Sequence, residues 1–181
     1  MIVKVLAAGI LVLNAFLLAL GLLYLFKRLT GFEEAEKRIS EAFDFFTAGF
    51  EELAFLLTSV SVLGSLYMSE VLEIPACEFC WYQRILIFPL PVILGVSLFM
   101  DRDDVADYVI SLAVLGLPVS IYHYIVQMSQ LSTGSCSTAV SCSSVQVQEF
   151  GFVTIPWMSL TLFLTVIALA LLSYRPQSKA S

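Results

Sequence analysis

The chain has 181 residues, of which 59% are hydrophobic and only 13% are charged, which is about half the charged share of a typical soluble domain. This composition predicts an integral membrane protein. The formal net charge of −6 leaves no basic field that would attract nucleic acid, so nucleic-acid binding is excluded as a function class.

The first 50 residues are predicted to form two helices of different character. Residues 5–26 are uncharged and long enough to span a bilayer. A cleaved signal peptide is the alternative, but the run exceeds a typical signal core and lacks a clear cleavage site. Lys27 and Arg28 follow the run, which favours an uncleaved anchor with its N-terminus outside. In residues 32–50 the apolar residues recur every three or four positions and charged residues occupy the opposite side, which predicts an amphipathic helix. This helix would lie in the membrane interface or pack on a neighbouring helix.

Four further membrane spans are predicted over residues 53–69, 81–100, 108–127 and 151–174. Pro89 and Pro91 are expected to kink the span at 81–100. The predicted fold class is therefore an all-α membrane protein with a four-helix transmembrane bundle over residues 51–175. An additional N-terminal transmembrane helix and a cytoplasmic-side amphipathic helix occupy residues 1–50, and residues 176–181 form a cytoplasmic tail.

The distribution of basic residues predicts the orientation of the spans. If the loop with Cys77 and Cys80 lies outside, only Lys4 and Arg84 lie outside with it. The remaining basic residues then lie inside: Lys27, Arg28, Lys37, Arg38, Arg102, Arg175 and Lys179. This positive-inside bias places the polar loop with Cys136 and Cys142 outside as well, so both cysteine pairs are expected on the oxidising, extracytoplasmic side.

The first cysteine pair belongs to the motif Cys77-x-x-Cys80-Trp81-Tyr82-Gln83-Arg84, directly before a span. A dithiol at this spacing can form a reversible disulfide. If a helix begins near Trp81, the helix dipole favours a thiolate at Cys80, and Arg84 lies one turn further on the same face. The alternative is a structural disulfide beside a membrane-anchoring arginine.

Two cysteine pairs on one side of a membrane suggest a thiol–disulfide relay. The pair next to the span needs an electron acceptor that resides in lipid, and a quinone is the obvious one. Arg84 and His123 lie about one turn inside their spans and could bind the quinone carbonyls, with Gln83 as a weaker candidate. The alternatives are an arginine that snorkels to the headgroups and a histidine held between helices.

A different class of protein is also consistent with the cysteines. All four could be structural, either as disulfides or as ligands of a zinc ion, in a membrane protein without catalytic activity. The oxidising location and the adjoining span argue against zinc, so no metal is predicted.

The motif resembles the signature of the DsbB/BdbC family of disulfide-bond-forming membrane thiol:quinone oxidoreductases. Residues 63–70 and 150–157 resemble the BdbC branch, and the Cys-x-x-Cys comes before the loop cysteines, whereas the order is reversed in VKOR-type reductases. The resemblance covers about residues 53–174. It implies an enzyme of the prokaryotic cell (inner) membrane that reoxidises a DsbA-like thioredoxin-fold partner. The electrons would pass to membrane quinone, either ubiquinone or menaquinone.

The resemblance also implies roles for individual residues. Cys136 would exchange with the partner, Cys142 with Cys77, and Cys80 would meet the quinone. Arg84 matches the quinone-side arginine of the family, and His123 is a looser match. The resting disulfide pairing stays open, and residues 1–50 have no counterpart in a basic four-helix member; they could brace the bundle, anchor it, or close a lipid-facing side of the quinone site.

Overall fold

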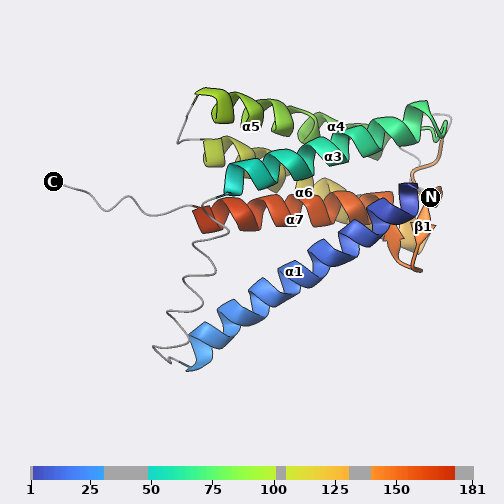
Figure 1. Cartoon of the computed structure of the whole chain (residues 1–181). Coiled ribbons are helices and arrows are strands. Elements are labelled where there is room, and N and C mark those ends of the chain that lie inside the picture. Colours follow the sequence, from blue (N-terminus) through green and yellow to red (C-terminus); the bar gives the residue numbers. More distant parts are fainter. Residues whose placement is uncertain (1, 31–48, 101–104, 131–139, 174–181) are drawn as a thin grey trace.

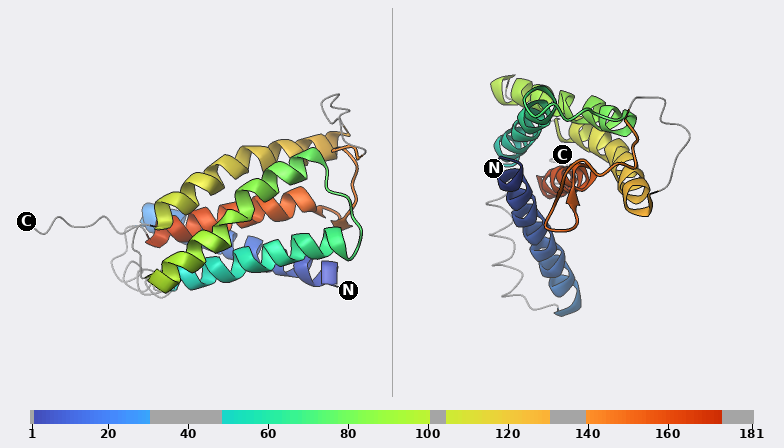
Figure 2. Two further views of the ribbon diagram at one scale, coloured as in Figure 1. Left: turned by 90° about the horizontal axis from the view of Figure 1, so that it is seen from above. Right: turned by 90° about the vertical axis from the view of Figure 1, so that its right-hand side faces the viewer.

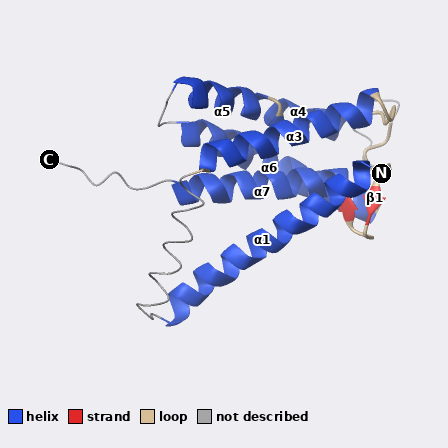
Figure 3. Ribbon diagram, in the orientation of Figure 1, coloured by secondary structure: helices blue, strands red, loops and turns tan. Residues whose placement is uncertain are grey.

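The protein is described from a computed structural model that covers residues 2–30, 49–100, 105–130 and 140–173. Figure 1 shows the helices of these segments running side by side, and Figure 3 shows how little strand accompanies them. The elements are α1 (Ile2–Thr30), α3 (Phe50–Glu70), α4 (Glu78–Ile87), α5 (Pro89–Met100), α6 (Val105–Ser129), β1 (Gln148–Glu149), β2 (Val153–Thr154) and α7 (Ile155–Ser173). The predicted all-α membrane class is confirmed. The amphipathic helix predicted over 32–50 falls almost entirely outside the described residues.

Within the described segments, four stretches of helix are long and apolar enough to cross a membrane: Ile2–Leu23, Phe50–Glu70, Glu78–Met100 and Val105–Ser129. The helix α7 carries a shorter apolar stretch, Ile155–Leu171. The expected helical start at Gly151 was wrong. Phe150 and Gly151 have positive φ angles of 51° and 82°, which turn the chain between β1 and β2 before the helix begins.

The span over residues 78–100 is interrupted where the prolines predicted a kink. The helix α4 ends at Ile87, and α5 begins at Pro89. The Phe88 N–H still donates to the Arg84 carbonyl at 2.8 Å, but Pro89 has no N–H with which to continue the hydrogen bonds of the helix. In contrast, Pro118 lies inside the continuous helix α6.

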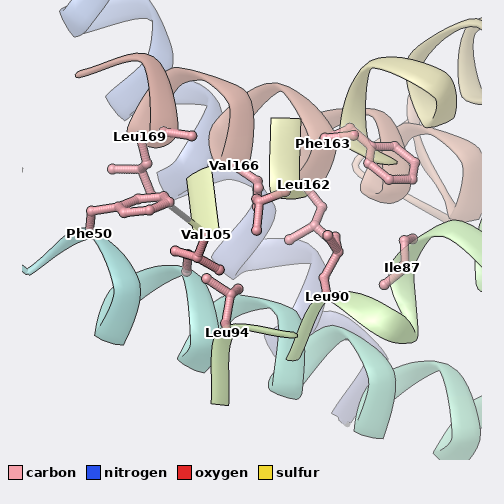
Figure 4. Close-up of a cluster of buried hydrophobic side chains, with 13 residues drawn as sticks. Phe50, Ile87, Leu90, Leu94, Val105, Leu162, Phe163, Val166 and Leu169 are labelled. Atoms are coloured by element: carbon pink, nitrogen blue, oxygen red, sulfur yellow. The ribbon is translucent and has the colours of Figure 1, made fainter. Parts of the chain in front are cut away.

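The apolar core lies between α3, α4, α5, α6 and α7 (Figure 4). Phe163 of α7 is fully buried in this core and packs against Gly116 of α6. The close approach of α6 and α7 depends on this glycine, because a Cβ atom at Gly116 would lie only 2.2 Å from the Phe163 ring. In a membrane, where lipid is as apolar as the side chains, such close contacts are what hold helices together.

The helix α1 is attached differently from the other helices. It packs on the bundle through its N-terminal half, and its far end diverges from α7 (Figures 1 and 2). A polar contact crosses this interface, because the Thr161 hydroxyl donates to Asn14 Oδ1 at 3.0 Å.

We expect Gly116→Ala to lower the free energy of unfolding by about 1–3 kcal/mol, because the added methyl group forces Phe163 out of its packed position. Thermal unfolding of the purified protein in detergent measures the effect. Gly21→Ala is the matched control, since a Cβ there meets nothing within 4 Å. Phe163→Leu should restore most of the loss in the Gly116→Ala background, and equal thermal stability of the two glycine variants would contradict the packing argument.

Candidate active site

The Cys77–Cys80 pair occupies the first turn of α4. Cys77 is the N-cap residue, and its carbonyl accepts a hydrogen bond from the Trp81 N–H at 3.1 Å. The helix therefore begins at Glu78, three residues earlier than the start near Trp81 considered from the sequence. Residues three apart share a helix face, and the two Sγ atoms are free thiols 3.2 Å apart.

A buried chain of hydrogen bonds leads from the pair to the only histidine. His123 is 2% exposed, and its Nε2 lies 3.5 Å from Cys77 Sγ. Gln83 is equally buried, and its Nε2 lies 3.3 Å from His123 Nδ1. Because an amide NH₂ can only donate, Nδ1 is the acceptor of that bond. Neutral His123 then carries its proton on Nε2, directed at Cys77.

These contacts favour a thiolate at Cys77. The hydrogen bond from the Cys80 thiol, followed by the hydrogen bond from His123, lowers the pKa of Cys77 well below its usual range. Burial raises the pKa and offsets only part of this effect. In this redox state the stabilised thiolate is therefore at Cys77, whereas the helix-dipole argument from the sequence placed it at Cys80.

The second cysteine loop packs against Cys77. Cys142 and Cys77 are 1% and 4% exposed and share a small apolar cluster with Val126 of α6. Two glutamines hold the loop there: Gln127 Nε2 donates to the Ser144 carbonyl at 3.1 Å, and Gln146 Nε2 donates to the Pro75 carbonyl at 3.0 Å. The structure thus brings one loop cysteine to the first pair.

The three described cysteines are in two redox states. Cys142 is in a disulfide, whereas Cys77 and Cys80 are free thiols. A Cys77–Cys142 bond, one of the pairings left open by the sequence, is therefore not formed. Cys136 lies outside the described residues.

Arg84 is fixed against α3 rather than extended to the surface. Its Nε donates to Ser65 Oγ at 3.0 Å, and its Nη2 donates to the Ser65 carbonyl at 3.2 Å and to Ser69 Oγ. The guanidinium carbon also lies 5.2 Å from the centre of the Trp81 ring. These contacts use Nε and Nη2, and among the described residues Nη1 has no hydrogen-bond partner, so Arg84 keeps donors for a ligand.

A cavity of about 500 Å³ lies beside this arginine. Cys80, Gln83 and Arg84 line it, together with mostly apolar residues of α1, α3, α4 and α7. The volume falls within the roughly 300–1,000 Å³ that is usual for pockets that bind small organic molecules. Cys80 lines this cavity and also a small second space beside His123, whereas Cys77 lines only the second space.

The structure thus separates residues that the sequence analysis grouped together. Arg84 and Gln83 reach the cavity wall, but His123 does not; it lies on the other side of Gln83, against Cys77. His123, Cys77 and Cys80 place three potential metal-ligand atoms within 4.8 Å of one another, and Cys142 is not part of this group among the described residues. A site made of all four cysteines is not the arrangement seen here.

Several residues that build the site were not identified from the sequence. Ser65 and Ser69 hold Arg84, and Ser159 lies with its hydroxyl 3.1 Å from Gln83 Oε1. A signal existed for the two α3 serines, since they stand four residues apart in an uncharged stretch of helix and the intramembrane arginine requires acceptors.

Fold and site together define a class of protein, namely a polytopic membrane protein with a thiol pair between a loop cysteine and an intramembrane cavity. A family model described as "Disulfide bond formation protein DsbB" matches residues 50–173. The chain belongs to this family of membrane disulfide bond formation proteins, which gives it an oxidoreductase role. No solved structure gives a significant match.

Relatives of known name agree with the family model. The chain is 40% identical to "Disulfide bond formation protein C" of Bacillus subtilis over 116 residues, which is 63% of this chain and 84% of the relative. It is 41% identical to a "Probable disulfide formation protein" of Oceanobacillus iheyensis over 123 residues, covering 66% of this chain and 85% of the relative.

We expect alkylation of reduced Cys77 by iodoacetamide to rise at a pH well below that at which an ordinary cysteine reacts, because only the thiolate reacts and the pKa of Cys77 is lowered. His123→Leu removes one hydrogen bond to that thiolate and should move the midpoint upward by about 1–2 pH units. Mass spectrometry of a Cys136→Ser/Cys142→Ser background resolves the Cys77 peptide. Tyr122→Phe, one residue away, is the control, and the same midpoint with and without His123 would contradict the assignment.

Proposed function

We propose that the protein oxidises the dithiol of an extracytoplasmic thioredoxin-fold partner and transfers the two electrons to a membrane quinone. The observation that carries this proposal is the position of the Cys77–Cys80 pair. Cys80 lines a largely apolar cavity beside a fixed arginine, and Cys77 packs against a cysteine of the polar loop. Electrons can therefore enter from the aqueous loop and leave toward lipid.

The partner first reduces the loop cysteines. A partner thiolate attacks the proposed Cys136–Cys142 disulfide and forms a mixed disulfide with Cys136. The second thiol of the partner then attacks the partner's own sulfur in this mixed disulfide and releases Cys136. The partner leaves as a disulfide, and Cys136 and Cys142 hold its two electrons and two protons.

The loop pair then reduces the membrane pair. The Cys142 thiolate attacks Cys77 of an oxidised Cys77–Cys80 disulfide, and Cys80 leaves as the thiolate. Cys136 next attacks Cys142, which restores the loop disulfide and releases Cys77. Release is favoured because a thiol of low pKa is a good leaving group, and the Cys80 and His123 hydrogen bonds lower the pKa of Cys77.

The quinone, as the acceptor substrate, takes the electrons from Cys80. Cys80 gives up its electron pair to the quinone, and the Cys77 thiolate attacks the Cys80 sulfur to close the disulfide. Two electrons and two protons leave with the quinol, which balances the step. Arg84 stabilises the negative charge that develops on the quinone oxygen, and Gln83 offers its amide at the same wall.

We further propose that both pairs lie on the extracytoplasmic side of a prokaryotic cell membrane. The excess of basic residues on the opposite side supports this orientation. The N-terminus of α1 lies at the same end of the bundle as the start of α4 (Figure 1), as an outer N-terminus requires.

The test follows quinone reduction by absorbance, with the purified protein, a reduced thioredoxin-fold protein and a soluble quinone analogue. We expect turnover with wild type and none with Cys77→Ser or Cys80→Ser. In Cys136→Ser/Cys142→Ser, a small dithiol such as dithiothreitol should still support quinone reduction, whereas the protein partner should not. Wild type without turnover, or Cys80→Ser with full turnover, would overturn the proposal. Zinc bound in stoichiometric amount would instead support a structural role for the cysteines.

Arg84→Ala should raise the KM for the quinone about 10–100-fold, since it removes a charge-assisted hydrogen bond to the developing oxyanion. The KM for the protein partner should stay the same. The Ser65→Ala/Ser69→Ala variant should shift the quinone KM in the same direction by less, because the arginine is retained but loses its supports. An unchanged quinone KM in Arg84→Ala would leave this arginine a packing role only.

A further inference from the structure

The cavity beside Cys80 has two chemically different ends. The polar end is formed by Cys80, Gln83 and Arg84 of α4 with two serines of α3, Ser65 and Ser69. The other end is apolar, and a large part of its wall comes from α1. The α1 residues that line it are Val5, Leu6, Gly9, Ile10, Val12 and Leu13.

The helix α1 contacts the rest of the bundle at both ends of this wall. Near the polar end, Leu6 Cδ1 lies 3.1 Å from the position that a Cβ atom at Gly64 would take, so the glycine lets α1 approach α3 closely. Beyond the apolar end, Thr161 of α7 donates to Asn14 at 3.0 Å. Toward its C-terminal end α1 moves away from the bundle (Figure 2).

Gly9 leaves free space in the middle of the wall. Val5, Gly9 and Leu13 follow one another at steps of four and therefore share a helix face, with Gly9 at its centre. A Cβ atom at Gly9 would meet nothing within 4 Å. The open volume is thus bounded by apolar side chains on either side of a residue that has no side chain.

We infer that α1 forms the binding wall for the proximal part of the quinone's isoprenoid tail, an inference that rests on the function proposed above. The ring then lies at the polar end, beside Cys80 and Arg84, and the tail passes along Gly9. A polar ring joined to an apolar chain matches a cavity with one polar and one apolar end. The wall lies outside residues 50–173, which match the family model, so it is a feature that this chain adds to the bundle.

The test compares two quinones that share a ring, one without a tail and one with a decyl tail. Gly9→Phe fills the space along the apolar wall. We expect the ratio of the two KM values, decyl over tail-less, to rise about tenfold, because a pocket distinguishes ligands through the groups that its walls touch. Gly21→Phe is the matched control, since Gly21 lies on the same helix, is equally unobstructed and does not line the cavity.

The outcomes separate this inference from the proposed function. An equal KM ratio in Gly9→Phe and Gly21→Phe overturns the tail-binding wall while leaving the quinone reductase activity in place. If Gly9→Phe raises the KM for both quinones by the same factor, the space at Gly9 belongs to the ring and the tail assignment is overturned. Wild type without turnover on either quinone removes the proposed function and this inference with it.

A second measurement uses the unmodified chain and does not depend on a variant that folds. A decyl quinone with a photoreactive group close to the ring should label α1 within residues 5–13, as located by mass spectrometry. An excess of unmodified decyl quinone should compete for the labelling, and an excess of the tail-less quinone should compete less. Labelling confined to other helices, or labelling of α1 without competition, would overturn the inference.

Discussion

The spacing of two cysteines on one helical turn determines how the rest of the site is arranged. Cys77 caps α4 and Cys80 lies three residues on, so their sulfur atoms are 3.2 Å apart while their surroundings differ. Cys77 belongs to the apolar cluster that includes Cys142, and Cys80 lies on the cavity wall. A helix is needed for this, because an irregular loop at membrane depth would leave backbone groups without hydrogen bonds. One turn of helix therefore places one sulfur atom beside the loop cysteine and the other on the wall of the cavity.

The buried polar residues beside the pair divide into two sets with different tasks. Gln83 and His123 form a chain of hydrogen bonds that ends on Cys77. Arg84 is held by serines of α3 and faces the cavity instead. Polar groups are costly to bury unless each finds a partner, and here the partners come from different helices. Gln83 lies between the two sets, because its buried amide contacts His123 of α6 and Ser159 of α7 and also lines the cavity.

The sequence predicted the elements of the fold better than it predicted their contacts. Composition and uncharged runs located the helices, and Pro89 marked the interruption between α4 and α5, because these are local properties of the chain. The cysteine motif located the first turn of α4 to within three residues. The sequence could not show that His123 lies behind Gln83 rather than at the cavity, since equal depth in two helices says nothing about which way each helix is rotated. The hairpin before α7 was missed because its turn depends on the backbone angles of Phe150 and Gly151.

The position of α1 follows from the weak driving force for helix association in lipid. Apolar surface alone does not hold a helix against a bundle when the surrounding lipid is equally apolar. Close packing and hydrogen bonds are required, and α1 has both, at Gly64 and at Thr161. Ala7, between these two contacts, is also fully buried, whereas a Cβ atom at Gly9 would meet nothing within 4 Å. The helix α1 is therefore packed on one side while Gly9 leaves space on the side of the cavity, so α1 forms a wall without filling the space beside it.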